Sequence, residues 1–350
     1  MADHARGNCL KERELISVLM AVYNTEVEFL GIALDSIISQ TYQNLEIVII
    51  DDGSTDLRTK AYLNGIKDNR VHIYRNKQNI GLTKSLNKGI RLCHGRYIAR
   101  MDADDVSEKN RIEEQYNFIK KHPCIMVGCK TYMISTHKLF CSVPNSTRYK
   151  IGLCFGNRGP AHSTFFLDKQ RMLDIGLIYN EDYQTCQDYA FVCECITRGE
   201  MIGMVKSTMV GYRVHDKQIS RTQRGRQIAD EERIRKDYIK RNYTVKSKTL
   251  EVLIQDINDY MYCGDDVDLD KVQSAIIDFS KDNSDEKIML GICRFWFEQC
   301  LFRYKYTHKT DFMRGKMFFK LLRPDRLLYI IGTLMLDRFL CTSLGHEKGI

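Results

Sequence analysis

Three carboxylates crowd into four positions of the segment MDADD, at Asp102, Asp104 and Asp105. Like charges at this spacing repel one another unless a cation or hydrogen-bond donors compensate them. A hard divalent ion such as Mg²⁺ or Mn²⁺ suits them, because it takes one or two carboxylates and completes its shell with water and substrate phosphate oxygens. The segment therefore favours a nucleoside diphosphate ligand. The same residues would equally suit an exposed acidic turn that caps a helix starting near Ser107.

A second acidic pair, Asp51 and Asp52, ends the apolar run IVII and is followed by GSTD. Gly53 permits a turn, and Ser54 or Thr55 can cap the next helix, which accounts for most of the segment. Asp51 stays unexplained, and a carboxylate at the carboxyl end of a strand is well placed to accept hydrogen bonds from a base or ribose. A response-regulator receiver domain also ends a strand in paired Asp residues, so the segment alone leaves both classes open.

Both acidic segments fall in a region where buried strands and helices alternate. Strands are expected at 15–22, 45–50, 71–74 and 96–101, and helices at 27–40, 55–67, 81–93 and 107–122. Strands separated by helices of this length pair in parallel through right-handed crossovers. The predicted fold class is α/β, with a doubly wound, mostly parallel nucleotide-binding sheet whose ligands bind beyond the carboxyl ends of the strands.

The pattern changes near Ser220. Before it, we expect a hairpin over 125–143 and a helix over 146–155; beyond it, long charged stretches show helical periodicity and no strand signal. We therefore expect a sheet domain at 13–220 and a mainly helical C-terminal extension at 221–350.

Composition excludes several classes of protein. The 350 residues are 43% hydrophobic and 28% charged, with only 4 Pro, which is typical of a globular chain and not of collagen-like or low-complexity sequences. No apolar run of about 18 residues offers a membrane span. The first residues lack a secretory signal, so we expect a cytoplasmic protein whose 13 Cys are thiols. A Walker-type loop, GxGxxG and HExxH are absent, which excludes P-loop, dinucleotide and zincin enzymes.

The net charge of +8 is unevenly distributed. Basic residues dominate 206–248 and 294–326, whereas acidic residues dominate 251–286. A basic face commonly meets phosphates, whether of nucleic acid, lipid headgroups or a diphosphate, and a solvated helix face is an equal alternative. The stretch 316–340 mixes large apolar residues with Lys and Arg, as expected of a helix in the headgroup plane; a core helix or a dimer contact is the alternative.

Five blocks, taken together, resemble family 2 glycosyltransferases with the GT-A fold over about residues 15–220. They are VLMAVYN, SIISQTYQNLEIVIIDDGSTD, NIGLTKSLNKGI, GRYIARMDADD and EEQYNFIKKHP. The resemblance implies that MDADD is the DXD motif, in which Asp102 holds the ribose or joins the metal shell. It implies that Asp104 binds a divalent ion, Mn²⁺ or Mg²⁺, which bridges the diphosphate.

The same resemblance places the nucleotide base at the first two strand ends. It implies that Asp51 holds the base, expected to be uracil, and that Val22 and Tyr23 line the base pocket. We place Asp52 with these nucleotide contacts. The segment YRVH, residues 212–215, resembles the ending of the family domain. Its Arg and His would reach the diphosphate or the metal, with a structural role equally open; we place Arg213 with the nucleotide and His215 with the metal.

Sugar transfer also needs a base to take the proton of the acceptor hydroxyl. In the resembled family this is an Asp on a helix, and the match here is TCQDYAFVCECITRG, which makes Asp188 the expected catalytic base. Gln187 stands where the family usually has an acid. The earlier EDY at 181–183 imitates the motif, but we prefer Asp188 because the residues after it continue as a helix that ends at Gly199. His162 matches a segment that often faces the acceptor, with a satisfied buried histidine as the alternative.

These assignments predict an inverting, metal-dependent hexosyl- or N-acetylhexosaminyltransferase. The donor is expected to be a UDP-sugar and the acceptor a hydroxyl of a glycan or lipid-linked saccharide, in bacterial surface polysaccharide synthesis. We expect peripheral contact with the inner face of the cell membrane and no nucleic-acid partner; oligomerisation stays open. A sugar nucleotidyltransferase would need a Gly- and Arg-rich loop where AVYNTEVEF stands. A non-catalytic membrane or nucleic-acid binder is the other alternative, and its salt-sensitive DNA binding would survive D104A.

Overall fold

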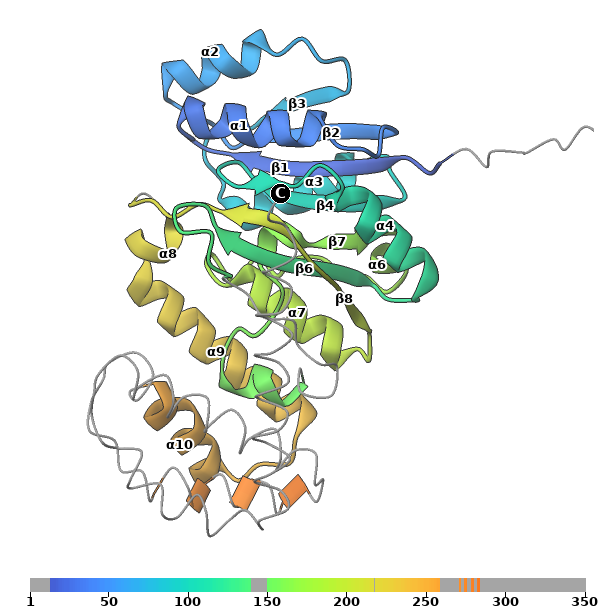
Figure 1. Ribbon diagram of the computed structural model, residues 1–350. Coiled ribbons are helices and arrows are strands. Elements are labelled where there is room, and N and C mark those ends of the chain that lie inside the picture. Colours follow the sequence, from blue (N-terminus) through green and yellow to red (C-terminus); the bar gives the residue numbers. More distant parts are fainter. Residues whose placement is uncertain are drawn as a thin grey trace, which may run out of the picture. The chain divides into compact units, whose positions relative to one another are not determined.

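Figure 1 shows the computed structural model, which describes residues 13–139, 150–216 and 218–258 and a few positions between 271 and 283. The chain divides into two compact units. The first comprises Met1–Pro144 and Arg158–Ile234, and the second comprises Asn145–Asn157 and Arg235–Ile350. The division falls inside helix α9 (Arg224–Asn242).

Four parallel strands form the part of the sheet that the alternating pattern predicts. They are β1 (Ile16–Val22), β2 (Leu45–Asp51), β3 (Val71–Arg75) and β4 (Tyr97–Asp102), in the order β3-β2-β1-β4. Strand β2 is buried along its whole length and β1 nearly so, as expected of strands covered on both faces.

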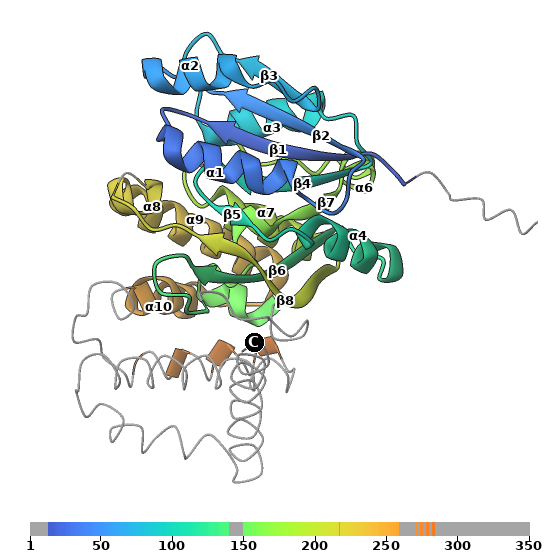
Figure 2. The same cartoon turned by 45° about the horizontal axis from the view of Figure 1, so that its top comes forward.

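Helices cover both faces of these strands (Figure 2). Apolar residues of α1 (Val27–Ile38), α2 (Leu57–Gly65) and α4 (Arg111–Lys121) share one core with the face of β1 that carries Val18 and Met20. Helix α3 (Leu82–Leu92) packs on the opposite face. It approaches closely at Gly89, where an added Cβ would lie 2.2 Å from Leu19 Cδ1.

The other half of the sheet mixes strand directions. Strand β7 (Phe166–Asp168) is antiparallel to both β4 and β6 (Met126–Met133). Strand β8 (Ile202–Tyr212) runs parallel to β6, and the short β5 (Val106–Ser107) is antiparallel to β8. The complete order is β3-β2-β1-β4-β7-β6-β8-β5. This arrangement confirms the predicted α/β class with a mostly parallel sheet.

The hairpin expected at 125–143 is confirmed only as a short turn after β6, because the main partners of β6 lie elsewhere in the chain. Strand β6 pairs with β7 and β8, which lie far along the chain, and its own return is one bridge between Tyr132 and Leu139. Residues 140–149, and with them the start of the helix expected at 146–155, lie outside the described residues; residues 150–152 are helical, and a 3-10 turn follows at Leu153–Phe155.

The remaining described elements are helical. They are a 3-10 turn at His162–Thr164, α6 (Lys169–Asp174), α7 (Gln187–Thr197), α8 (Ile219–Thr222), α9 and α10 (Ser247–Asn258). The domain limits expected at 13–220 and 221–350 stay a prediction.

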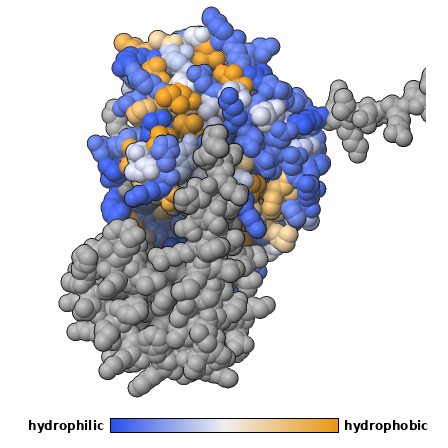
Figure 3. All heavy atoms as spheres, in the orientation of Figure 1, coloured by the Kyte–Doolittle hydropathy of each residue, from blue (hydrophilic) through white to orange (hydrophobic). Residues whose placement is uncertain are grey.

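The side of the first unit that is visible in Figure 3 is largely hydrophilic, with small groups of apolar residues among the polar ones. Tyr23 and Leu57 are among the exposed apolar side chains. Within the described part of the chain, none of the helices combines the length and the apolar character needed to cross a bilayer. The stretch 316–340, expected at a membrane surface, lies outside the described residues.

Candidate active site

Strand register brings the expected site residues to one rim of the sheet. Val22 on β1 lies across from Asp51 on β2, and Ala21 lies across from Asp102 on β4. The carboxyl ends of three neighbouring parallel strands therefore meet at this rim, which is where ligands bind in open α/β sheets.

Asp51 is buried at the end of β2, with only 1% of its surface exposed. Its Oδ1 accepts a hydrogen bond from the Ser54 backbone N–H at 2.9 Å, and its Oδ2 lies 3.3 Å from Nε of Arg75. Arg75 is the residue directly across from Asp51 in the β2–β3 register. Arg75 was not among the residues expected at the site, although both residues end neighbouring strands of the predicted sheet.

The carboxylate of Asp52 accepts hydrogen bonds from the loop that leads into α3. Its Oδ1 accepts from Asn76 Nδ2 at 2.8 Å and from the Ile80 N–H at 2.9 Å, and its Oδ2 accepts from the Gly81 N–H at 2.9 Å. Gly81 is the N-cap of α3. Asp52 therefore fixes the start of this helix, a structural task that the sequence analysis did not foresee, and its contact with a nucleotide stays a prediction.

Hydrogen bonds connect the loop after β1 to the loop after β2. Val22 is buried and Tyr23 is 47% exposed at the rim. Asn24 adopts the left-handed conformation, with φ of 49°, which Asn tolerates better than most residues. Its Oδ1 accepts from the N–H groups of Thr55 and Asp56 at 2.8 and 2.9 Å. These bonds hold the two loops at a fixed separation.

The buried, positively charged side chain of Arg100 contacts the acidic cluster. Arg100 stands two residues before Asp102 on β4, and both its Nη atoms donate to the two carboxylate oxygens of Asp102. Arg100 is 2% exposed, whereas the Asp102 side chain is 32% exposed. Burial favours a lower pKa for Arg100, but the charge of Asp102 contributes most to a net rise. Part of the compensation that the sequence analysis assigned to a metal ion thus comes from the strand itself.

Asp104 contacts two residues that follow β8, Arg213 and His215. Its Oδ2 lies 2.8 Å from Nε2 of His215, and its backbone oxygen accepts from Nε of Arg213 at 2.8 Å. Phe29 supports both partners, because the Arg213 guanidinium carbon lies 4.4 Å from its ring centroid and the His215 ring lies 5.6 Å away. Burial and the charge of Asp102 raise the pKa of Asp104, while the bond with His215 opposes the rise.

Asp105 is the most buried member of the cluster, at 1% exposure. Its Oδ1 accepts from the Arg213 N–H at 2.9 Å, and its Oδ2 is buried with no hydrogen-bond partner among the described residues. Burial, with the charges of Asp102 and Asp104, raises its pKa to about 8. The alternative of a helix cap is wrong, because α4 begins only at Arg111 and β5 lies between.

The donor set at this rim fits a hard divalent ion. The neighbouring Asp104 oxygen and His215 nitrogen could both turn to one ion, and the unpartnered oxygen of Asp105 shows that hydrogen bonds alone do not satisfy the cluster. Across the described residues, His, Cys, Asp and Glu nowhere form a group of three placed to hold a metal. An ion here would take few protein ligands and depend on phosphate and water, as Mg²⁺ and Mn²⁺ commonly do.

Asp188 stands in the first turn of α7. Burial is the main cause that raises the pKa of Tyr179; the charges of Asp188 and Asp102 raise it further, and Arg100 lowers it. The charges of Asp188 and Asp102 thus shift the pKa of the same tyrosine in the same direction, although the two residues lie far apart in the sequence. His162 joins this group through a 2.8 Å contact between its Nε2 and the Tyr179 hydroxyl.

The competing EDY segment lies outside the helix. Residues 181 and 182 form a turn, and Glu181 Oε1 accepts from Asn87 Nδ2 of α3 at 3.0 Å. The expected loop placement of Glu181 and Asp182 is therefore confirmed.

His162 has a strongly lowered pKa, caused by burial and by the charge of Arg100, so it is a neutral imidazole that is hydrogen-bonded inside the fold.

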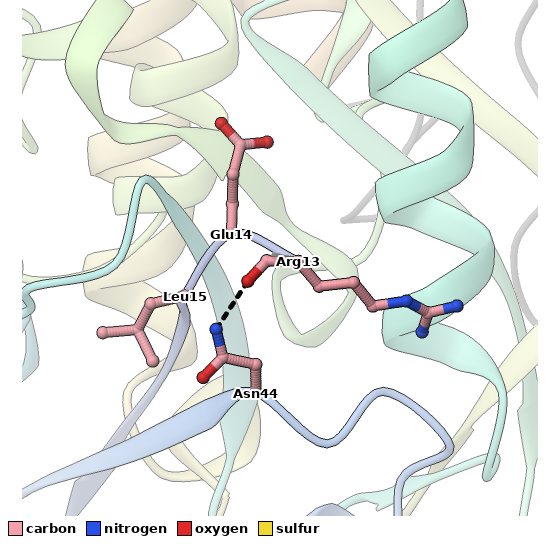
Figure 4. A pocket seen from close by; sticks show the side chains of 4 residues that line it. All are labelled: Arg13, Glu14, Leu15 and Asn44. Atoms are coloured by element: carbon pink, nitrogen blue, oxygen red, sulfur yellow. Dashed lines mark hydrogen bonds between the residues drawn. The ribbon is translucent and has the colours of Figure 1, made fainter. Parts of the chain in front are cut away.

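A separate pocket of about 580 Å³ lies at the other end of β1 (Figure 4). It is lined by Arg13, Glu14, Leu15 and Asn44, and Asn44 Nδ2 donates to the Arg13 backbone oxygen at 2.6 Å. Leu15 directly precedes β1, whereas the carboxylates gather where β1 ends. This pocket is therefore not part of the candidate site.

Comparisons with known proteins agree with this geometry. Residues 17–175 match the family model described as glycosyl transferase family 2. The chain is 32% identical over 241 residues to an uncharacterized glycosyltransferase of Haemophilus influenzae, covering 64% of this chain and 73% of that protein. It is 30% identical over 210 residues to the Escherichia coli UDP-Glc:alpha-D-GlcNAc-diphosphoundecaprenol beta-1,3-glucosyltransferase WfaP, covering 59% and 80%.

The fold has solved counterparts. The mannosyltransferase PcManGT from Pyrobaculum calidifontis, solved in complex with GDP-Man and Mn²⁺, aligns with a TM-score of 0.55 at 14% identity. The alignment covers 89% of this chain and 86% of that one. The sheet, the match to the family model and the relatives together establish that the chain is a GT-A-fold member of glycosyl transferase family 2.

Proposed function

We propose that the chain is an inverting, metal-dependent glycosyltransferase that moves a sugar from a UDP-sugar to a hydroxyl of a glycan or lipid-linked acceptor. The observation that carries the proposal is the gathering of carboxylates at the carboxyl ends of neighbouring parallel strands. Asp51 and Asp102 lie at one sheet rim, Asp104 lies beside His215, and Asp188 stands in the first turn of α7.

The donor would lie across the strand ends. Asp51, held by Arg75, would accept from the base, with Val22 and the exposed Tyr23 beside it. Arg213 would offer its guanidinium to the diphosphate, since a planar fork suits phosphate oxygens. The relative WfaP is named for a UDP-Glc donor, so UDP-glucose is our first choice.

Asp104 and His215, with Asp102 beside them, would hold Mn²⁺ or Mg²⁺. When bound, such an ion supplies positive charge to the leaving diphosphate. Asp188 would take the proton of the acceptor hydroxyl, whose oxygen forms a bond to the anomeric carbon as the bond to the diphosphate breaks. Attack from the face opposite the leaving group inverts the configuration at that carbon.

The acceptor is proposed to be a lipid-linked saccharide at the inner face of the cell membrane. WfaP is named for a GlcNAc-diphosphate-lipid acceptor. Described residues of α9 include exposed basic side chains, among them Arg224, Arg226 and Lys236. Exposed basic side chains attract anionic headgroups. Surface polysaccharide assembly is the setting that fits such an acceptor.

Two variants of the full chain test the proposal. Wild type should bind UDP more tightly with Mn²⁺ than without it, as measured by thermal shift, and should transfer from UDP-glucose to a GlcNAc-diphosphate-lipid. D104A should lose the Mn²⁺ dependence of UDP binding. D188N should keep UDP binding and lose transfer. D182N is the matched control in the competing segment and should transfer like wild type; normal transfer by D188N would refute the assignment of the base.

A further inference from the structure

The turn that leads into Asp188 is held by α9. Thr185 donates its backbone N–H at 3.1 Å and its hydroxyl at 2.7 Å to the same oxygen, Oδ2 of Asp230. The next residue, Cys186, donates its thiol to the backbone oxygen of Gln227 at 3.5 Å. All these residues belong to the first unit of the chain.

Two arginines of the same helix hold the residues just before this turn. Arg226 donates to Oε1 of Gln184. Arg233 donates to the Asp182 backbone oxygen at 2.8 Å, and its guanidinium carbon lies 4.3 Å from the centroid of the Tyr183 ring. The contacting positions of α9 are 226, 227, 230 and 233, a spacing that places them on one face of the helix.

Asp230 makes two hydrogen bonds to Thr185, three residues before the proposed base. Its side chain is 15% exposed and Thr185 is 2% exposed, so water competes little for their hydrogen bonds. From the other side, the Thr83 hydroxyl of α3 donates to the Tyr183 backbone oxygen at 2.8 Å. The segment is thus fixed between two helices.

The conformation at the start of α7 depends on such support. Cys186 is the N-cap and adopts the left-handed region, with φ of 54° and ψ of 23°, and its side chain makes no cap. A residue other than Gly keeps this conformation only where its surroundings impose it. Thr is a good N-cap residue, but Asp230 engages the Thr185 hydroxyl. Loss of Asp230 would free that hydroxyl to cap the helix and let the first turn, which carries Asp188, reorient.

We propose that Asp230 is a positioning residue, which holds the turn at 185–186 and thereby aims the Asp188 carboxylate at the acceptor hydroxyl. The inference rests on the proposed function, in which Asp188 is the base. Asp230 acts through Thr185 and not on the reacting atoms, so its loss should slow turnover and leave donor binding intact.

The experiment compares D230A, D230N and the control D237N in the full chain, with UDP-glucose, Mn²⁺ and a GlcNAc-diphosphate-lipid acceptor. D230A should lower kcat about ten- to a hundredfold, since a small misplacement of a catalytic group is costly. The KM for UDP-glucose and the thermal shift by UDP should stay as in wild type. D230N keeps an acceptor oxygen and should recover most of the activity. Asp237 pairs with Arg241 of its own helix, so D237N should match wild type.

A second measurement does not need turnover. Amide hydrogen exchange should become faster at residues 185–190 in D230A, and stay unchanged in α4. T185V combined with D230A should be scarcely worse than D230A alone, because both changes remove the same hydroxyl contact.

The outcomes separate two failures. If D188N is inactive while D230A keeps the kcat of wild type, the positioning role is wrong and the proposed function stands. If D188N transfers like wild type, the base assignment falls and the positioning role falls with it. Equal loss of UDP binding and turnover in D230A would show general damage and overturn the inference. If no probe turns over, unchanged exchange at 185–190 overturns it.

Discussion

Arg75 lies directly across the β2–β3 register from Asp51, with Nε 3.3 Å from the carboxylate Oδ2. The two residues end neighbouring parallel strands, so the sheet itself sets their separation. This pair gives the proposed base pocket a fixed polar edge, in which a buried acid is accompanied by an arginine that is 45% exposed at its side chain.

R75M should weaken UDP binding about tenfold, as measured by calorimetry in the presence of Mn²⁺. The variant leaves a buried carboxylate oxygen without this partner, which costs about 1–3 kcal/mol and disturbs its orientation. The matched control is R70M, because Arg70 pairs with Asp68 at the other end of β3. Equal UDP affinities of R75M and wild type would remove Arg75 from the site.

Replacement of Phe29 should disturb Arg213, the proposed diphosphate contact, without removing any of the side chains proposed to bind the nucleotide. F29L keeps an apolar side chain but removes the ring beneath the guanidinium, an interaction of about 0.5–1 kcal/mol when exposed and more when desolvated. We expect a severalfold rise in the KM of the UDP-sugar, and recovery in F29Y, which restores a ring. A KM for F29L equal to that of F29Y would contradict this function of the ring.

The buried Glu46 should make stability depend on acid pH. Burial alone would raise its pKa, but hydrogen bonds from Ser17, His94 and Gly95 together outweigh burial and lower it below 4.5. A lowered pKa means that the folded state favours the ionised form, so this stability is present above pH 4.5 and is lost as the pH falls through the folded pKa. The free energy of unfolding, followed by urea titration, should decline below pH 4.5.

E46Q should flatten this acid limb, because glutamine does not titrate. E28Q is the control: Glu28 also has a lowered pKa, but it lies in an exposed pair with Arg58, and such pairs contribute little to stability. An acid limb in E46Q as steep as in wild type would refute the assignment.

G89A should destabilise the fold by about 1–3 kcal/mol, the usual range for overpacking a core. Its Cβ would meet Leu19 Cδ1 at 2.2 Å between α3 and β1. G65A is the control, because nothing lies within 4 Å of a Cβ built there. The double variant G89A/L19A should overpack less than G89A, because the Leu19 side chain that the new Cβ meets is shortened. The denaturant midpoints of the variants, compared with wild type, will show whether the clash with Leu19 causes the loss of stability.

The sequence predicted the first half of the sheet closely because each element there carries its own signal. The strand expected at 15–22 is Ile16–Val22, and the helix expected at 81–93 is Leu82–Leu92. The second half depends on pairing between distant segments: β6 finds its partners in β7 and β8, which periodicity within 125–143 does not encode. Strand β5 has only two residues, too few for any periodic signal.

Site residues could likewise be predicted where a local signal marks them, and not where they depend on contacts between distant segments. Asp51 and Asp102 were predicted because they end recognisable strands, and register places them at one rim. Arg100 was missed, although its spacing of two from Asp102 on a strand puts both on one side of the sheet. Phe29 and Asp230 contact residues far along the chain, Arg213 and Thr185, so no local pattern marked them.

The arginine beneath Asp102 has a consequence for the order of events at the rim. A carboxylate that already shares its charge with a shielded guanidinium attracts a free metal ion less strongly than a bare one. The proposed ion would then be captured most firmly when a nucleotide arrives with its own negative phosphates. In the proposed mechanism, firm binding of the metal ion would therefore follow binding of the nucleotide.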